Sequence, residues 1–430
     1  MDSLAIEGAE PIRGPKNPLP DPWPREVGPN ALTYLEEWVR SGNTADLLGR
    51  FDEAFARLNG ARYAISVANC TVACHTAISA VGVGPGDEVI VSPISDYGTL
   101  YGIIAQRAIP VFSDVNPLNG NVTAEDVKRR ITSKTRALIL THWAGITIDM
   151  DPIMEISSSY NLPVIEDCCQ APLAKYRNSN AGTIGSLGCF SFDNEKHISC
   201  GTGGAVITDE EVYAKRASNF AEARGSFVED PLYGRRHKIL GCNYRFDGLR
   251  AAECLAQIEI LPVQVARRRY LGAKLNKLLS EIEGIRPCPI PADGDAVYWI
   301  FPFIVETEAL CVDLDTFAAA LNAEGLAASS GRYYLIPDSH DLLNDLRHTY
   351  SIGDRPGGNR DTYFDRKYSA GMTPKAKWYV DHMLRWTFTE KYSDTDVEDI
   401  ATIISKVANR YRRKTLHISR PNRGLMNPEM

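Results

Sequence analysis

An acidic residue and a lysine lie at two places where an α/β sheet would bring side chains together. Asp167 ends a short apolar run, residues 164–167, and Lys196 lies in a short connection between the apolar runs 188–193 and 203–208. A carboxylate at a strand end is expected at the carboxyl edge of the sheet, where open α/β folds bind their ligands. A lysine on a connection between two buried strands can reach the same edge.

This pair of residues matches what pyridoxal phosphate chemistry requires. The cofactor needs a lysine that bonds to its aldehyde and then moves a proton from the substrate carbon. It also needs a carboxylate that keeps its ring nitrogen protonated, so that the ring accepts electrons. The glycines that follow the lysine, Gly201, Gly203 and Gly204, allow a tight turn beside a ligand. Spacing alone leaves open a turn or cap role for Asp167 and a solvated surface role for Lys196.

Two kinds of sequence segment alternate between residues 60 and 210, and they predict the elements that would position these residues. Short β-branched runs predict strands, and amphipathic stretches at 123–131 and 149–160 predict helices between them. Strands that alternate with helices indicate βαβ units and a mainly parallel sheet covered on both faces. The predicted strands are residues 61–68, 87–93, 109–115, 136–143, 162–169, 188–193 and 203–208.

This alternation of strand-like and helix-like segments ends at about residue 211. Residues 248–282 predict one or more long helices, with Pro262 as a break or kink. We therefore predict a large α/β domain over 1–265, a smaller α+β domain over 266–413 and a loose tail over 414–430.

The composition excludes several classes of protein. The chain has 430 residues, a formal net charge of −7 and no long basic run, so nucleic acid is not an expected partner. The polar, Pro-rich start does not resemble a signal peptide, and no run approaches the ~18 apolar residues of a membrane span. Several of the ten cysteines lie in apolar runs, which indicates reduced, buried thiols and a cytoplasmic location. No second Cys pair or His cluster completes a zinc pattern, so no metal site is expected.

The segment around Asp167 and Lys196 resembles the DegT/StrS-type sugar aminotransferase family. Members carry a strand ending in Glu-Asp-x-x-Gln, then Ser-Phe and a lysine five residues after that serine. This chain has Glu166-Asp167 with Gln170, Ser191-Phe192 and Lys196 in the same register. The resemblance covers most of residues 5–410. Further blocks match the family in order at 7–24, 83–93, 110–117, 141–153 and 241–252.

The resemblance implies pyridoxal phosphate fold type I, with a large, mainly parallel α/β/α domain and a smaller α+β C-terminal domain. It implies pyridoxal 5'-phosphate as cofactor, with Lys196 as the catalytic residue that holds the aldehyde. Asp167 would pair with the ring nitrogen, Gln170 would approach the ring hydroxyl and Ser191 would bind the phosphate.

Three further site residues follow from the resemblance. Cys70 and Thr71 match a Gly-Thr pair that opens a helix and binds phosphate through backbone N–H groups. Asn243 would reach the phosphate of the neighbouring subunit's cofactor, which implies a homodimer with shared active sites.

The chain departs from the family pattern at two of these places. The family usually has Ser-Gly-Thr where this chain has Asn69-Cys70-Thr71. The aromatic residue that stacks on the ring is expected near residue 96, which here is an aspartate. We expect Tyr97 to take its place, with Tyr101 as the alternative.

Other conspicuous residues are not assigned to the site. His142 is left open between a substrate contact and a core histidine, and His197 is expected to point away from the site. Tyr333 and Tyr334 fall where the small domain of the family nears the active site, but such a pair is more often packing. The run 267–270, RRRY, is interpreted as a solvated helix face.

The resemblance predicts transfer of an amino group from glutamate or glutamine to a keto sugar, either a sugar nucleotide or a cyclitol. A deoxysugar dehydratase on the same scaffold carries His in place of the lysine, so Lys196 argues against it. An aromatising synthase of an aminoshikimate-like ring keeps the lysine and stays open. A non-catalytic regulator that binds pyridoxal phosphate would need an effector module, and the first 50 residues contain one short helical stretch and no second recognition helix.

Overall fold

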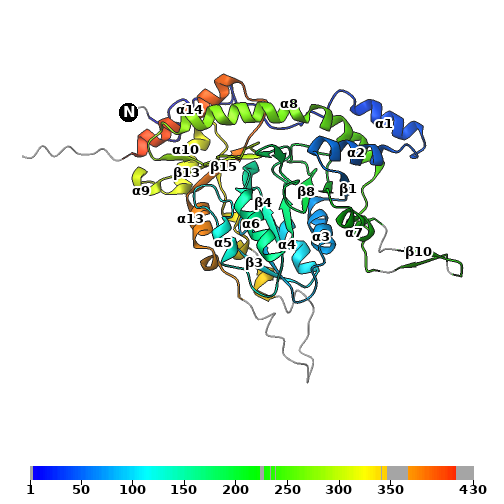
Figure 1. Cartoon of the computed structure of the whole chain (residues 1–430). Helices are drawn as coiled ribbons and strands as arrows, with labels where there is room; N and C mark the ends of the chain where they lie inside the picture. Colours follow the sequence, from blue (N-terminus) through cyan, green and yellow to red (C-terminus); the bar gives the residue numbers. More distant parts are fainter. Residues whose placement is uncertain are drawn as a thin grey trace, which may run out of the picture.

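The computed structural model describes residues 3–222, 227–232, 234–237, 239–339, 341–345 and 367–412. Within them the largest element is a seven-stranded sheet with strand order β1-β9-β8-β5-β4-β2-β3 (Figure 1). Each of its strands overlaps one of the seven runs that the sequence predicts, with β4 and β8 beginning one residue before their runs. Their bounds are β1 Tyr63–Val67, β2 Glu88–Val91, β3 Ile109–Phe112, β4 Thr135–Thr141, β5 Val164–Asp167, β8 Leu187–Ser191 and β9 Gly204–Thr208.

The sheet is mainly parallel, as predicted. Strands β3, β2, β4, β5 and β8 run parallel to one another, whereas β9 pairs antiparallel with both β8 and β1. The carboxyl ends of β5 and β8 therefore lie at the same edge as the start of β9. The connection that carries Lys196 joins β8 to β9, so it crosses this edge beside Asp167.

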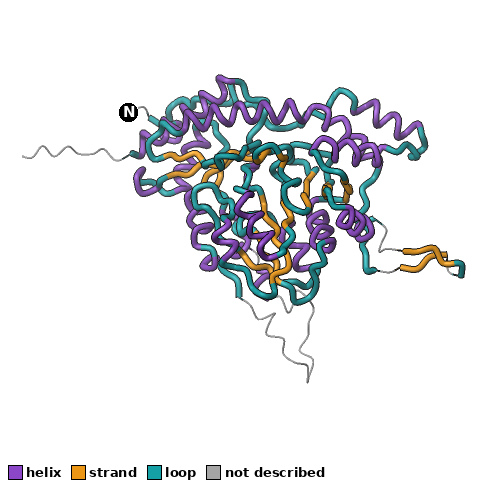
Figure 2. The backbone as a smooth tube through the Cα atoms, in the orientation of Figure 1, coloured by secondary structure: helices purple, strands orange, loops and turns teal. Residues whose placement is uncertain are grey.

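Helices cover both faces of the sheet (Figure 2). Because successive side chains of a strand point to opposite faces, Val89 and Val91 pack with α3 and α4 while Ile90 packs with α6. Both faces are buried, which explains why the strands read as continuous apolar runs. The helices around this sheet are α1 Ala31–Arg40, α2 Leu47–Asn59, α3 Cys70–Ala80, α4 Tyr97–Ala105, α5 Ala124–Lys128, α6 Met150–Tyr160 and α7 Glu211–Ala221.

A smaller sheet, of order β12-β13-β15-β14, forms the C-terminal α+β part of the described chain. The helix α8, Gly248–Leu279, lies along both parts and runs through residue 265 (Figure 1). The division at 265/266 therefore stays a prediction. The elements of this part are β12 Ile285–Pro287, β13 Ile300–Val305, β14 Ser329–Ser330, β15 Met383–Thr387, α9 Thr307–Leu310, α10 Leu314–Ala323, α11 Ile336–Ser339, α13 Pro374–His382 and α14 Asp394–Tyr411.

Two expectations for α8 need correction. Pro262 does not break the helix, so of the predicted break or kink only a kink stays a prediction; packing of α8 against α1, α2 and α14 outweighs the backbone hydrogen bond that proline cannot donate. The run 267–270 is not a solvated face, since Arg268 is only 1% exposed. Its guanidinium donates to Glu390 Oε2 at 2.7 Å and to the carbonyls of Tyr298 and Phe388 at 2.8 and 2.7 Å. This arginine thus ties α8 to the end of β15.

One predicted segment cannot be compared with the structure. The tail at 414–430 lies outside the described residues. Among the helices that the structure does describe, none is both long and apolar enough to cross a lipid bilayer.

Candidate active site

A cavity of about 390 Å³ lies at the edge of the main sheet where β5 and β8 end. Its walls come from the starts of α3 and α4, the β8–β9 connection and two segments of the C-terminal part. Residues from both parts of the described chain therefore meet around one space. The lining residues are Asn69, Cys70, Thr71, Cys74, Asp96, Gly98, Thr99, Asp167, Cys169, Gln170, Ser191, Asp193, Glu195, Lys196, Thr202, Trp299, Tyr333 and Tyr334.

The carboxylate of Asp167 is held in a fixed orientation at the end of β5. Its Oδ2 accepts a hydrogen bond from Thr99 Oγ1 at 2.5 Å, and Thr141 Oγ1 lies 3.3 Å from the same oxygen. Its Oδ1 accepts from the backbone N–H of Cys169 at 3.1 Å. Ser95 Oγ lies 2.7 Å from Thr99 Oγ1 and accepts from Thr141 Oγ1 at 3.0 Å, so the two threonine hydroxyls are themselves oriented. This buried network aims the carboxylate into the cavity.

Lys196 lies on a connection that side chains from distant parts of the chain hold in place. Its Nζ is 3.6 Å from the centroid of the Trp299 ring, a cation–π contact. The indole N–H of Trp299 donates to the carbonyl of Glu195 at 2.8 Å. Arg25 Nη2 donates to the same carbonyl at 2.8 Å, and Trp23 Nε1 donates to the carbonyl of Asn194 at 3.3 Å. The backbone that carries the lysine is therefore anchored from outside the connection.

The start of α3 offers free backbone donors to the cavity. Asn69 caps this helix, since its Oδ1 accepts from the Val72 N–H at 3.0 Å. In the described part of the chain, no hydrogen bond takes up the N–H groups of Cys70 and Thr71. Gly204 allows β9 to pass close by, because an added Cβ would lie 2.7 Å from Cys70 N. A helix start with free N–H groups favours an anion such as phosphate.

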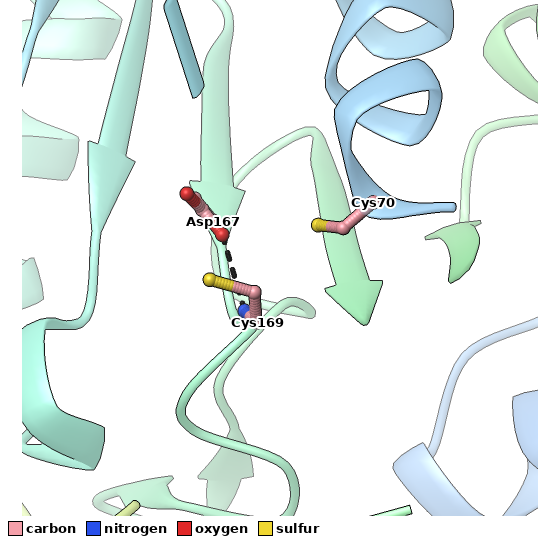
Figure 3. A group of neighbouring side chains, drawn as sticks. All are labelled: Cys70, Asp167 and Cys169. Carbon is pink, nitrogen blue, oxygen red and sulfur yellow. Dashed lines mark hydrogen bonds between the residues drawn. The ribbon is translucent and has the colours of Figure 1, made fainter. Parts of the chain in front are cut away.

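Two thiols lie beside the carboxylate on the cavity wall. Figure 3 shows Cys70 on α3, and Cys169 just after Asp167. The two sulfur atoms and a carboxylate oxygen of Asp167 all lie within 4.8 Å of one another. The hydrogen bond with Cys70 and burial raise the pKa of the Cys169 thiol well above its usual range. Cys169 is therefore a neutral, weakly nucleophilic thiol at neutral pH.

The structure brings six of the eight predicted site residues together. These six line the cavity, and two others do not: Tyr97 and Asn243. Tyr97 is the first residue of α4, next to lining residues on both sides, and its ring packs against Tyr101 at a centroid distance of 6.1 Å. The exposed Asn243 accepts from Arg245 Nε at 2.8 Å. The six lining residues are Cys70, Thr71, Asp167, Gln170, Ser191 and Lys196.

Sequence reasoning missed Thr99 and Trp299 and set aside Tyr334. Thr99 lies in the stretch 97–105, for which no helix was predicted from the sequence. Trp299 and Tyr334 reach the cavity only through tertiary packing, with their ring centroids 6.5 Å apart. The family-like block at 83–93 ends just before α4, and it was the only sequence signal near Thr99.

The two histidines left out of the site have structural contacts. The buried His142 shares a hydrogen bond of 2.9 Å with Glu166, and its Nδ1 accepts from the Ile148 N–H at 3.0 Å. His197 Nε2 lies 3.2 Å from the carbonyl of Val297. His142 is thus a satisfied core residue, and His197 is not among the residues that line the cavity.

The residues of the cavity fit pyridoxal phosphate. A lysine amine, a buried carboxylate and a helix start with hydroxyl groups from Thr71 and Ser191 supply partners for an aldehyde, a ring nitrogen and a phosphate. Together with the mainly parallel sheet and the smaller α+β part, they define the class: the fold is that of the fold type I aminotransferases.

Comparison with known proteins gives the family. The model of the DegT/DnrJ/EryC1/StrS aminotransferase family matches residues 30–351, and the chain belongs to this family. It is 30% identical to L-glutamine:scyllo-inosose aminotransferase of Streptomyces griseus over 96% of this chain and 99% of the relative. It is 32% identical to GDP-perosamine synthase of Escherichia coli O157:H7 over 63% of this chain and 72% of the relative. The crystal structure of 3-amino-5-hydroxybenzoic acid synthase shares the fold, with a TM-score of 0.76, 24% identity and coverage of 91% of this chain and 99% of that one.

Proposed function

We propose that this aminotransferase uses pyridoxal 5'-phosphate to move an amino group from glutamine or glutamate to the ketone of a sugar nucleotide or a cyclitol. The observation that carries the proposal is the meeting of Lys196, Asp167 and the open start of α3 around one cavity. The relatives named above support the acceptor class, since one is named for an inosose and the other for a GDP-linked product.

Different residues of the cavity would bind different chemical groups of the cofactor. Pyridoxal phosphate, when bound, supplies an aldehyde for covalent attachment and a ring that accepts electrons. Lys196 would hold the aldehyde, and Asp167 would hold a proton at the ring nitrogen. Cys70, Thr71 and Ser191 would bind the phosphate through backbone N–H and hydroxyl groups.

Gln170 would orient the ring from the side of its hydroxyl group. Its Oε1 already accepts from the Ala144 N–H at 2.6 Å, which fixes the side chain and leaves the amide nitrogen as a donor. Asp96 occupies the expected place of the stacking aromatic residue, and Tyr97 is outside the lining, so the ring stack is not assigned to either residue.

Lys196 would also carry the proton of the reaction. Its Nζ, beside the Trp299 ring, is the amine in the cavity that can move a proton at the amino-bearing carbon of the substrate. Trp299 and Tyr334, 6% and 8% exposed, form an aromatic wall that excludes water from this transfer.

Reduction and half-reaction assays test the proposal. Borohydride treatment of the purified holoenzyme should fix the cofactor on Lys196, as peptide mapping would show, and Lys196→Ala should carry no such label. Glutamine or glutamate should convert the bound cofactor to its amine form, seen as a change in absorbance, and a keto sugar or cyclitol should reverse it. Label on another lysine would refute the site. No change with any amino donor would refute transamination and favour the aromatising synthase or the regulator.

We further propose that the enzyme is a homodimer with shared active sites. The support is the exposed position of Asn243 outside the cavity of its own chain, where a partner subunit could use it. Mixed subunits of Lys196→Ala and Asn243→Ala should regain activity, because one site of each heterodimer then carries no lesion. No recovery, or full activity of Asn243→Ala alone, would exclude the shared site.

A further inference from the structure

His197 follows the proposed catalytic lysine directly, and it is buried. It is 6% exposed and does not line the cavity. Its Nε2 lies 3.2 Å from the carbonyl oxygen of Val297, which is 100 residues further along the chain. The proposed function gives this imidazole no role, although its backbone is continuous with that of Lys196.

The contacts of this imidazole define its protonation. A carbonyl oxygen only accepts, so Nε2 carries the hydrogen and donates it to Val297. Among the residues that the structure describes, Nδ1 has no hydrogen-bond partner. Burial, together with the nearby Arg268 and Arg25, lowers the pKa of His197 well below its usual range. The ring is therefore neutral at neutral pH, and its single N–H is used to bind the segment just before β13.

The same short segment holds the backbone on the other side of Lys196. The indole N–H of Trp299 donates to the carbonyl of Glu195 at 2.8 Å. Residues 195 and 197 are thus both bonded to the segment 297–299, and Lys196 lies between them with its Nζ over the Trp299 ring. We call this pairing of residues 195–197 with residues 297–299 the lysine clamp.

Tyr298, in the middle of the second segment of the lysine clamp, has an unusual backbone. Its φ is +49°, in the left-handed region that a bulky residue rarely adopts. Its ring stacks on Phe301 at a centroid distance of 5.0 Å, and its hydroxyl accepts from Asn276 Nδ2 at 2.6 Å. An added Cβ on Gly272, inside α8, would lie 2.1 Å from the Tyr298 ring. Because glycine is less favourable than alanine inside a helix, the space that this ring needs explains the glycine. Strain of this kind persists only where surrounding contacts hold it, and it gathers at functional sites.

We infer that His197 and Tyr298 are positioning residues for Lys196. This rests on the proposed function, in which Lys196 holds the cofactor and moves the proton. His197 ties the backbone after the lysine to Val297, and Tyr298 holds Val297 and Trp299 where both bond to the connection. The lysine amine therefore extends from a backbone that is fixed on both sides, which keeps it near its reacting partners.

Variants of His197 test the role of its hydrogen bond. His197→Met removes the donor and keeps an apolar side chain, whereas His197→Gln offers an amide N–H in place of Nε2–H. We expect kcat of His197→Met to fall about three- to tenfold, as for the loss of one hydrogen bond, with KM for glutamine changed less than about twofold. His197→Gln should recover most of this loss. His382→Met, which removes a ring nitrogen 2.8 Å from the carbonyl of Trp378 outside the cavity, should leave kcat unchanged.

Hydrogen exchange measures the clamp without turnover. The backbone amides of residues 194–199 should exchange about three- to tenfold faster in full-length His197→Met than in the wild type, with and without pyridoxal phosphate. His197→Gln and His382→Met should exchange at the wild-type rate in this segment. Wild-type exchange in His197→Met, or an equal loss of kcat in His197→Gln, would overturn the role of His197.

A double-variant cycle tests Tyr298. Gly272→Ala favours the helix but displaces the Tyr298 ring, so it should speed exchange at residues 194–199 and lower kcat about three- to tenfold. Tyr298→Asn should do the same, although asparagine adopts the left-handed backbone readily, because it loses the contacts of the ring. The smaller side chain leaves room for an alanine, so the double variant should be no worse than Tyr298→Asn alone. Additive losses of kcat in the double variant would overturn the role of the ring.

Borohydride labelling separates this inference from the proposed function. If the wild-type holoenzyme carries no label on Lys196, the proposed function fails, while the exchange rates of residues 194–199 still decide whether His197 and Tyr298 hold the connection. If the label is on Lys196 but His197→Met keeps wild-type exchange and kcat, the inference fails and the proposed function stands.

Discussion

The hydroxyl group of Thr99 should matter for catalysis through its hydrogen bond to Asp167. Thr99→Val replaces the hydroxyl with a methyl group of similar size, so the packing of α4 is kept while the 2.5 Å hydrogen bond to Asp167 is lost. Hydrogen bonds to charged groups contribute about 1.5–3 kcal/mol, and about 1.4 kcal/mol corresponds to a tenfold change in rate. We therefore expect kcat/KM to fall about 10- to 150-fold, with weaker retention of the cofactor on dialysis.

Two further variants make this test specific. Thr99→Ser restores the donor and should recover most of the activity, which a loss of packing alone would not allow. Thr76→Val is the matched control, because its hydroxyl is equally buried but donates to the carbonyl of Val72 at 2.7 Å, away from the site. Steady-state kinetics and cofactor absorbance measure all three variants. Wild-type kcat/KM in Thr99→Val, or an equal loss in Thr76→Val, would show that the network does not position Asp167.

Three other predictions concern packing, phosphate binding and pH. Arg268→Met should cost about 3–5 kcal/mol in the free energy of unfolding, since Glu390, with a side chain only 13% exposed, loses its partner, and adding Glu390→Leu should recover part of it in urea unfolding. Gly204→Ala should weaken pyridoxal phosphate binding at least about tenfold by displacing the start of α3, whereas Gly84→Ala, with open space around it, should not. Burial raises the pKa of Asp52 to about 7, well above its usual range in an unfolded chain. The folded state therefore holds this proton more tightly, so the contribution of Asp52 to stability is greatest below about pH 4 and is lost as the pH rises through 7. Asp52→Asn should flatten this fall in melting temperature between pH 5 and 8, and an unchanged slope would contradict the assignment.

Much of the main sheet could be predicted because its strands are buried on both faces. Such strands read as short continuous apolar runs, and each of the seven runs overlaps a strand of the sheet. The proximity of Asp167 and Lys196 also follows from local information. Once β5 and β8 are parallel neighbours, a residue at the end of one and a residue just after the other must share an edge.

The residues that complete the cavity could not be predicted in the same way. Thr99 contributes through a hydrogen bond to a residue 68 positions away, and no local pattern encodes that distance. For the run 267–270 the local pattern was misleading, because its charged residues predicted a helix face exposed to solvent. Arg268 is buried because Glu390 and two carbonyl groups from a distant segment supply its partners. Charge in a sequence indicates an exposed face only when no such partner is brought to it.

The position of Lys196 illustrates why a motif alone does not make a site. The register of Ser191 and Lys196 places the lysine on the connection after β8, but it does not fix where the connection lies. Arg25 from the N-terminal segment and Trp299 from the edge of the smaller sheet both donate to the carbonyl of Glu195. The Trp299 ring then holds the lysine amine at 3.6 Å from its centroid. The Pro-rich start of the chain and the segment just before β13 therefore help to position the proposed catalytic lysine, because they orient the backbone from which it extends.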